Sequence, residues 1–327
     1  MRVAGIDCGT NSIRLLIADT AGPSSADPDG GNRGGLVDVV REMRVVRLGQ
    51  GVDRTGRLAP EAIERTRAAL TDYAEMIAEC GAQRVRMVAT SATRDAANRD
   101  DFVRMVRSVI GADPEVISGD QEAALSFAGA VGSLPGLRAP VLVADIGGGS
   151  TELVMGSPDE TAGARGGELR APNLLAHSMD VGCVRMTERH LHDDPPTADQ
   201  IEGALGDVRA AIARAQRDVP THEARAFVGV AGTVTTIAAI ALGLDRYDAG
   251  LIHASVITAE QVEEVTAKLL AMTHEERAAL PVMHPGRVDV IGGGALVLRA
   301  LVEATNAAEV IASEHDILDG IALSLLG

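Results

Sequence analysis

The sequence contains the same acidic glycine motif twice. The first copy, DCGTNS, spans residues 7–12, and the second copy, DIGGGS, spans residues 145–150. Their aspartates and their serines are each 138 residues apart (145 − 7 and 150 − 12), so the copies match in register. Each copy lies between two apolar runs, which predicts a strand, a turn and a strand. The repeat indicates a duplicated domain with two glycine turns, and the backbone N–H groups of such turns can hold phosphate.

The pattern around the motifs predicts a mixed α/β fold. The glycine-rich segments 21–35 and 156–167 are expected to be surface loops, and each leads into a further strand, at Val39–Leu48 and at Leu174–Met186. The remaining predicted elements are strands at Val85–Ala89 and Glu115–Ile117, and helices from Pro60 to Gly81, from Pro196 onward, around Val262–Leu269, at 120–131 and at 314–326. A strand meander followed by helices in each half is typical of a mixed α/β unit.

Composition argues against several classes of partner. Aromatic residues make up 2% of the chain, tryptophan is absent, and the formal net charge is −16. Nucleic acid is therefore not expected, because bases stack on aromatic rings and phosphate backbones attract positive charge. No apolar stretch is long enough for a membrane span, and three dispersed cysteines favour a reducing compartment. We expect a cytoplasmic protein that binds neither nucleic acid nor a membrane and that can form a homodimer.

Five segments, in order along almost the whole chain, resemble one known family. They are Val3–Ser12, Ala89–Arg94, Ile117–Ala123, Asp145–Glu152 and Gly229–Thr233. Together they resemble the exopolyphosphatase and guanosine pentaphosphate phosphatase family (Ppx/GppA) in its short, two-domain form. That family has the actin-like ATPase superfold, so the resemblance implies duplicated actin-like (ribonuclease H-like) α/β domains with a ligand cleft between them. The expected domains are residues 1–125 and 126–311, with a C-terminal helix at about 312–327 packing back on the first.

The resemblance also implies catalytic and metal-binding roles. Glu122 matches the family's general base, which deprotonates the attacking water, and Arg94 matches an arginine near the terminal phosphate. Asp145 and Glu152 match acidic residues around the metal and its water, with Asp7 as their partner in the first turn. Such carboxylates suit Mg²⁺ or Mn²⁺. From the residues alone, Glu122 is better explained as a first-turn glutamate that favours the helix dipole, and Asp7 can instead cap its own turn.

The other candidate site residues would cradle phosphoryl oxygens through hydroxyl and backbone N–H groups. They are Gly9, Thr10, Asn11 and Ser12 in the first turn, Gly147, Gly148, Gly149, Ser150 and Thr151 in the second, Thr90, Ser91 and Thr93 beside Arg94, and Gly232 and Thr233 further on. A glycine segment at 291–295 also leads into a helix, whose N-terminus can bind an anion. The two copies differ in charge, because Arg14 in the first corresponds to Glu152 in the second.

Family members commonly carry two consecutive glutamates where this chain has Gln121 and Glu122. The second residue matches the catalytic position, so activity is expected to remain. The missing first carboxylate is a departure that can alter pH dependence or metal preference.

The resemblance implies a metal-dependent phosphohydrolase. The expected reaction releases the terminal phosphate of inorganic polyphosphate or the 5′ terminal phosphate of guanosine pentaphosphate. Long chains need a basic track, for which the sequence offers only Arg185, Arg287 and the group Arg41, Arg44 and Arg47, so short chains are favoured. Two alternatives remain open: an actin-like small-molecule kinase, because DCGTNS also resembles the sugar-kinase phosphate turn, and a catalytically silent alarmone or nucleotide sensor.

Overall fold

The structure, a computed structural model, describes residues 1–20, 36–158 and 174–326, so most of the two predicted glycine-rich loops lies outside the described residues. The chain divides into two compact units. Unit 1 consists mainly of Met1–Pro135 and Asp316–Gly327, and unit 2 consists of Gly136–Ser157 and Leu174–His315. In the described part of the chain, no helix combines the length and the apolar character needed to cross a bilayer.

Unit 1 is built on a five-stranded sheet in the order β3-β2-β1-β4-β5. Strand β1 pairs antiparallel with β2 and parallel with β4. The strands are β1 (Arg2–Cys8), β2 (Ser12–Thr20), β3 (Leu36–Val45), β4 (Arg84–Ala89) and β5 (Glu115–Val116). The helices are α1 (Val52–Thr55), α2 (Pro60–Cys80), α3 (Ser91–Asp95), α4 (Arg99–Ile110), α5 (Gly119–Val131) and α13 (Ile317–Ser324).

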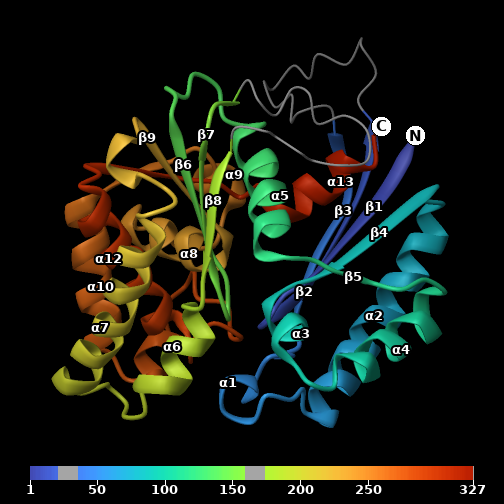
Figure 1. Ribbon diagram of the computed structural model, residues 1–327, viewed down its shortest axis with the longest axis horizontal. Coiled ribbons are helices and arrows are strands. Elements are labelled where there is room, and N and C mark those ends of the chain that lie inside the picture. The colour runs from blue at the N-terminus through green and yellow to red at the C-terminus, as the bar shows by residue number, and fades with distance from the viewer. Residues whose placement is uncertain (21–35, 159–173, 327) are drawn as a thin grey trace. The chain divides into compact units, whose positions relative to one another are not determined.

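Strands β1 and β2 are largely buried on both faces of the sheet, and the strand alternation decides which helix each side chain meets. Ile6 lies in the core formed with α2 and α4, which run side by side in Figure 1. Val3 and Leu16 lie in the core on the opposite face, beneath α13. Asp7 and Arg14 are separated from these two residues by even numbers of positions, so their side chains also project toward the α13 face.

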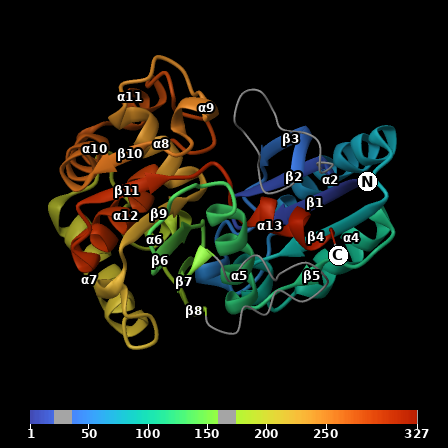
Figure 2. The same cartoon turned by 90° about the horizontal axis from the view of Figure 1, so that it is seen from above.

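Helix α13 packs on α5 and on the sheet of unit 1, as Figure 2 also shows for this helix beside β1 and β4. The backbones come very close. A Cβ atom added at Gly129 would lie 1.8 Å from the carbonyl oxygen of Asp316, and one added at Gly320 would lie 2.1 Å from that of Leu125. Only glycine leaves room for this approach. Asp316, the N-cap residue of α13, is thereby held firmly on unit 1.

Unit 2 is built on a six-stranded sheet in the order β10-β11-β9-β6-β7-β8. Helices α7, α10 and α12 pack together beside it (Figure 2). The strands are β6 (Val141–Ile146), β7 (Thr151–Gly156), β8 (Leu175–Met179), β9 (Ala226–Val230), β10 (Val256–Thr258) and β11 (Glu309–Ala312). The helices are α6 (Cys183–His190), α7 (Ala198–Ala215), α8 (Ala231–Ala241), α9 (Ala249–Ile252), α10 (Ala259–Ala271), α11 (His274–Ala278) and α12 (Ile291–Thr305).

The two units repeat one architecture. The order β3-β2-β1-β4-β5 in unit 1 corresponds to β8-β7-β6-β9-β11 in unit 2, with β10 added at the edge. The two glycine turns also have the same geometry: the N–H of Gly9 donates to Ser12 and that of Gly147 donates to Ser150, each over 3.0 Å. The predicted duplication of an actin-like α/β domain is therefore confirmed.

The predicted helix from Pro60 to Gly81 is confirmed, with proline in its first turn and Gly81 in the left-handed conformation at its end. The strand predicted at Val39–Leu48 is shifted, because β3 spans Leu36–Val45. The strand predicted at Leu174–Met186 is wrong beyond Met179, where the chain turns and α6 begins at Cys183. This segment is too apolar for its helical part to be distinguished from a buried strand by periodicity.

The glycine segment at 291–295 forms the first turn of α12 and packs between helices. Gly293 lies against Cys183 and Thr187 of α6, and Gly294 lies against Thr233 of α8. These glycines therefore allow close helix packing, and the segment lies inside α12 instead of forming a loop that leads into the helix.

Candidate functional site

The first glycine turn is held by the chain that follows β3. The N–H of Gly9 is used inside the turn, where it donates to Ser12. The N–H groups of Val46 and Arg47 both donate to the carbonyl of Asn11, over 3.0 and 2.8 Å. The turn is thus fixed in shape before any ligand binds, which favours catalysis because a preformed phosphate cradle needs little reorganisation.

The second turn is held in the same way. The N–H groups of Val184 and Arg185, in the first turn of α6, donate to the carbonyl of Gly148 over 2.9 and 3.1 Å. These two donors follow Val46 and Arg47 by 138 residues (184 − 46 and 185 − 47), which is the spacing of the motifs themselves. Their acceptors, Asn11 and Gly148, are 137 residues apart (148 − 11), and the donors follow β3 in unit 1 but lie in α6 in unit 2, so the two clasps are similar without matching in register.

Helix α6 approaches the second turn so closely that its N-cap position requires glycine. A Cβ atom added at Gly182 would lie 2.6 Å from the carbonyl oxygen of Gly148 and 2.8 Å from that of Gly147. The backbone at Gly182 is extended, so glycine is needed for space and not for conformation. Arg185 completes the clasp by donating from Nε to the carbonyl of Gly149 over 2.7 Å.

Hydroxyl groups gather between the first turn and α3 in unit 1. Thr10 Oγ1 and Ser91 Oγ lie 2.9 Å apart and are buried, so the structure brings together residues from two of the resembling segments. Thr90 is also buried and precedes α3 as its N-cap. Thr93 Oγ1 is buried without a hydrogen-bond partner. Because an unsatisfied buried hydroxyl is unfavourable, Thr93 is suited to donate to a ligand oxygen.

Glu122 and Arg94 form an ion pair in unit 1. Arg94 Nη1 donates to Glu122 Oε2 over 3.1 Å and to the carbonyl of Ile117 over 3.2 Å. Glu122 is 7% exposed, in the first turn of α5. Its carboxylate is therefore shielded from bulk solvent and oriented by the Arg94 guanidinium. A glutamate that only stabilised the helix dipole would need neither burial nor a fixed orientation.

The cap of α5 explains the departure at Gln121. Ser118 Oγ accepts from the N–H of Gln121 over 3.3 Å, and Gln121 Oε1 accepts from the N–H of Ser118 over 3.0 Å. This is a capping box, in which glutamine and glutamate serve equally well. Gln121 is exposed, whereas Glu122 is buried, so the glutamine lies on a different face of the helix from the catalytic candidate.

Restoring the commoner glutamate is therefore expected to have little effect. Gln121→Glu should change the rate of phosphate release by less than about twofold and the free energy of unfolding by no more than about 0.5 kcal/mol, as at other exposed positions. Steady-state rates across a pH series and a chemical unfolding curve would measure both quantities. A shift of the pH–rate profile between Gln121→Glu and the wild type would show that the side chain at position 121 affects catalysis. A role confined to the capping box would leave that profile unchanged.

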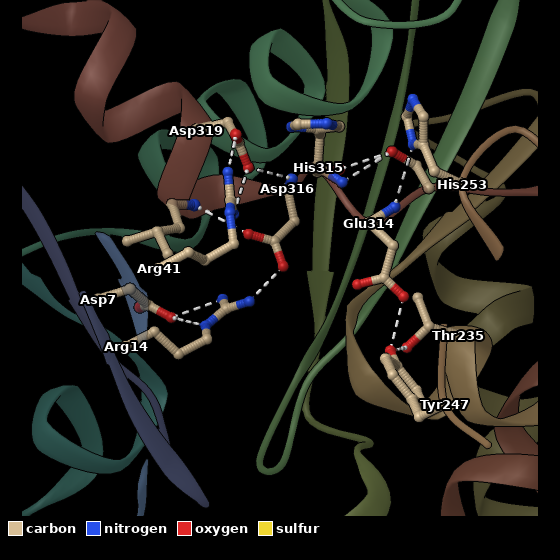
Figure 3. A network of polar contacts seen from close by, with 12 residues as sticks. Asp7, Arg14, Arg41, Thr235, Tyr247, His253, Glu314, His315, Asp316 and Asp319 are labelled. Carbon is tan, nitrogen blue, oxygen red and sulfur yellow. Dashed lines mark hydrogen bonds and ion pairs between the residues drawn. The ribbon is translucent and has the colours of Figure 1, made fainter. Parts of the chain in front are cut away.

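Asp7 in β1 is paired with Arg14, its partner across the hairpin. Arg14 Nε and Nη2 both donate to Asp7 Oδ2, over 3.0 and 2.6 Å, while Arg14 Nη1 contacts Asp316 (Figure 3). Burial raises the pKa of Asp7, and Arg14 opposes that shift. Asp7 Oδ1 is buried and accepts no hydrogen bond. One oxygen of this carboxylate is therefore left for a ligand.

The equivalent pair in unit 2 consists of two acids. Asp145 lies directly opposite Glu152 across the β6–β7 hairpin, and both are buried, at 6% and 1% exposed. Ser178 donates to Glu152 Oε1 over 2.8 Å. Like charges directly opposite on a sheet destabilise each other. A buried pair of this kind is suited to a divalent cation.

The donor set fits a hard divalent cation with water in its coordination shell. Mg²⁺ typically uses one or two carboxylates and keeps several waters. In unit 2, the adjacent Asp145 and Glu152 carry carboxylate oxygens of this kind. In unit 1, taken by itself, Asp7 Oδ1 is another. Within the described residues, no group of three or more His, Cys, Asp or Glu side chains is placed to hold a metal ion by itself.

The last predicted segment lies at the start of α8. Arg287 Nη1 donates to Thr236 Oγ1 over 3.0 Å, and its guanidinium lies against Gly232. Thr233 is buried beside α12. In the second turn, Thr151 Oγ1 donates to the carbonyl of Val181 over 2.7 Å, so its proton is committed to the protein.

Several residues around these groups escaped the sequence prediction. Asp316, Ser178 and Gly182 each touch a predicted residue but lie far from it in sequence, and none belongs to a recognisable motif.

Comparison with known proteins gives consistent results. A family model described as the Ppx/GppA phosphatase family matches residues 29–327. Exopolyphosphatase 2 of Mycobacterium tuberculosis is 53% identical over 335 residues, which covers 100% of this chain and 99% of that protein. Among solved structures, an exopolyphosphatase-like protein is 45% identical with a TM-score of 0.88, over 99% of this chain and 98% of its own. The Aquifex aeolicus member of the Ppx/GppA family is 29% identical with a TM-score of 0.77, over 99% and 97%.

Proposed function

Because the chain belongs to the Ppx/GppA phosphatase family, we propose that it releases the terminal phosphate of inorganic polyphosphate by attack of a water molecule that Glu122 activates. The named relative with nearly the same length, exopolyphosphatase 2, supports polyphosphate as the substrate. A single observation carries the choice of base: Glu122 is a buried carboxylate at 3.1 Å from Arg94.

In the proposed reaction, Glu122 accepts a proton from water as the water oxygen attacks the terminal phosphorus. The bond from that phosphorus to the bridging oxygen breaks, and the shortened chain leaves with the bridging oxygen. Arg94 has two tasks: it orients the Glu122 carboxylate, and its guanidinium lies near enough to interact with a phosphoryl oxygen bound beside Glu122. Phosphoryl transfer depends mostly on positioning and charge neutralisation, so these two groups act together with a phosphate cradle and a divalent cation.

Hydroxyl and backbone groups are proposed to hold the phosphate chain. In unit 1 these are Thr10, Ser91 and Thr93, of which Thr93 has an unpartnered buried hydroxyl. In unit 2 they are the second glycine turn and Ser150, kept in shape by α6. The N–H groups of Gly9 and Gly147 close their own turns, so these two glycines contribute shape to the cradle.

We propose Mg²⁺ or Mn²⁺ as the cofactor, held by Asp145 and Glu152 and by Asp7. A bound divalent cation supplies charge neutralisation at the phosphoryl oxygens. Among the protein's own residues, Ser178 orients Glu152 by donating to one oxygen of its carboxylate. Arg14 likewise takes only one oxygen of Asp7.

Short chains are the proposed substrates, because two of the five arginines that would form a basic track already pair with acidic side chains. Arg41 pairs with Asp38 and Asp319, and Arg44 pairs with Asp72. With a net charge of −16, little positive potential remains to attract a long polyanion.

The test is a comparison of initial rates on short polyphosphate, long polyphosphate and guanosine pentaphosphate in one Mg²⁺ buffer. We expect kcat/KM for short chains to exceed that for long chains by about tenfold, the lower range of electrostatic steering effects. Release from guanosine pentaphosphate alone would redirect the proposal to the alarmone. ATP consumption that depends on an added acceptor would indicate a kinase, and ligand binding without turnover of any phosphate chain would indicate a sensor.

A further inference from the structure

Two Asp–Arg pairs bridge the same hairpin, β1–β2, but their geometries differ. Arg2 lies opposite Asp19, and Arg14 lies opposite Asp7. Arg2 makes a fork, with Nε to Asp19 Oδ1 over 3.0 Å and Nη2 to Oδ2 over 2.7 Å. Arg14 instead directs both Nε and Nη2 to one oxygen of Asp7, over 3.0 and 2.6 Å. The other oxygen, Asp7 Oδ1, is buried and has no hydrogen-bond partner.

The fork is the ordinary arrangement for arginine and a carboxylate, because two parallel N–H groups match two oxygens. It recurs in this chain at Arg41 with Asp319 and at Arg107 with Asp113. An isolated Arg14–Asp7 pair would therefore be expected to form a fork and to satisfy both oxygens of Asp7. The deviation needs a cause outside the pair.

Asp316 supplies that cause. It accepts from Arg14 Nη1, the one guanidinium nitrogen that Asp7 does not engage (Figure 3). Its side chain is only 5% exposed. Asp316 cannot follow the arginine, because its Oδ1 accepts from the N–H of Leu318 over 2.9 Å and its own N–H donates to Asp319 over 3.1 Å. It is the N-cap of α13, which is docked on unit 1 by backbone contact with α5.

We infer that Asp316 is a positioning residue: by holding Arg14 from the far side, it prevents a fork with Asp7 and keeps Asp7 Oδ1 available for a cation or for a water bound to it. The inference rests on the proposed role of Asp7 as a ligand of the divalent cation. Asp316 also balances the positive charge of Arg14. The Arg14 guanidinium therefore repels an incoming cation less than it would without Asp316.

The test compares Mn²⁺ binding to the whole chain with and without Asp316→Asn. Binding is measured by isothermal titration calorimetry or by the electron paramagnetic resonance signal of free Mn²⁺. Asparagine is as good an N-cap as aspartate, so α13 keeps its cap while the ion pair to Arg14 is lost. We expect the Mn²⁺ dissociation constant to rise at least about tenfold, as for other residues that orient metal ligands. A crystal structure of the variant should show Arg14 forked on both oxygens of Asp7.

Two matched variants accompany the test. Asp19→Asn removes a carboxylate from the forked pair in the same hairpin and should leave Mn²⁺ affinity unchanged. Asp316→Ser offers a second uncharged N-cap and should weaken binding as Asp316→Asn does, which guards against a folding defect in either variant.

The outcomes separate the two proposals. If Asp7→Asn binds Mn²⁺ as the wild type does, Asp7 is not a cation ligand, and this part of the proposed function fails together with the inference. If Asp7→Asn weakens binding but both Asp316 variants retain wild-type affinity, with Arg14 unmoved in the crystal structure, the inference about Asp316 alone is overturned.

Discussion

Replacing Glu122 with glutamine is expected to reduce kcat for phosphate release from short polyphosphate by about 10²- to 10⁴-fold, the usual contribution of a general base. Glutamine has nearly the same shape as glutamate but cannot accept the proton of the attacking water. Arg94 retains an acceptor in the amide oxygen, so the pair keeps its geometry. Because the substrate contacts remain, KM should change little, and the loss should fall on kcat.

The matched control is Asp120→Asn. Asp120 precedes Glu122 by two residues in the first turn of the same helix, but it is exposed. If these acidic residues only favoured the helix dipole, both substitutions would cost a few tenths of a kcal/mol of stability and neither would slow catalysis. Equal kcat values for Glu122→Gln and the wild type would remove Glu122 as the base and leave the helix-dipole explanation.

Replacing Gly182 with alanine is expected to lower kcat/KM by about 10²-fold, because a displacement of about 1 Å in a positioning element has effects of that size. The added methyl group would meet backbone atoms of Gly147 and Gly148 at 2.6–2.8 Å, and backbone cannot rotate aside as a flexible side chain can. Either the second turn or α6 must move. We also expect a loss of about 1–3 kcal/mol in the free energy of unfolding, as for other overpacked sites.

Gly206→Ala in α7 is the control for this substitution. Gly206 is exposed and helical, and a Cβ atom there meets nothing within 4 Å. Alanine should therefore raise the free energy of unfolding by up to about 1 kcal/mol through helix propensity and leave kcat/KM unchanged. Steady-state kinetics and thermal unfolding of both variants provide the comparison. Wild-type kinetics in Gly182→Ala would show that the clasp of α6 on the turn has no part in substrate binding.

Much of the fold could be predicted from the sequence because its signals are local. The apolar runs on either side of DCGTNS and DIGGGS identified both hairpins, and Pro60 and Gly81 marked the ends of α2. The duplication was visible because both motifs kept their order and spacing. Glu122 could be named only through the resemblance to a family, since a first-turn glutamate is common in any helix.

The prediction failed where local signals compete. The apolar residues in 174–186 fit the spacing of a strand as well as that of a helix. The end of β8 and the start of α6 could therefore not be separated. The segment 291–295 has the composition of an anion loop, yet its glycines serve the packing of α12 on α6 and α8. A run of glycines indicates that another group comes close to the backbone. It does not show whether that group is a ligand or a neighbouring helix.

The sequence by itself determined the two turns, their strands and the carboxylates beside them, because a hairpin places residues such as Asp7 and Arg14 opposite each other by register alone. Only the tertiary structure decided how these groups are used. Asp316, 302 residues from Arg14, turns that arginine away from one oxygen of Asp7. The reason is physical: a guanidinium has several N–H groups but one orientation at a time, and the orientation is set by whichever acceptors the folded chain brings into reach.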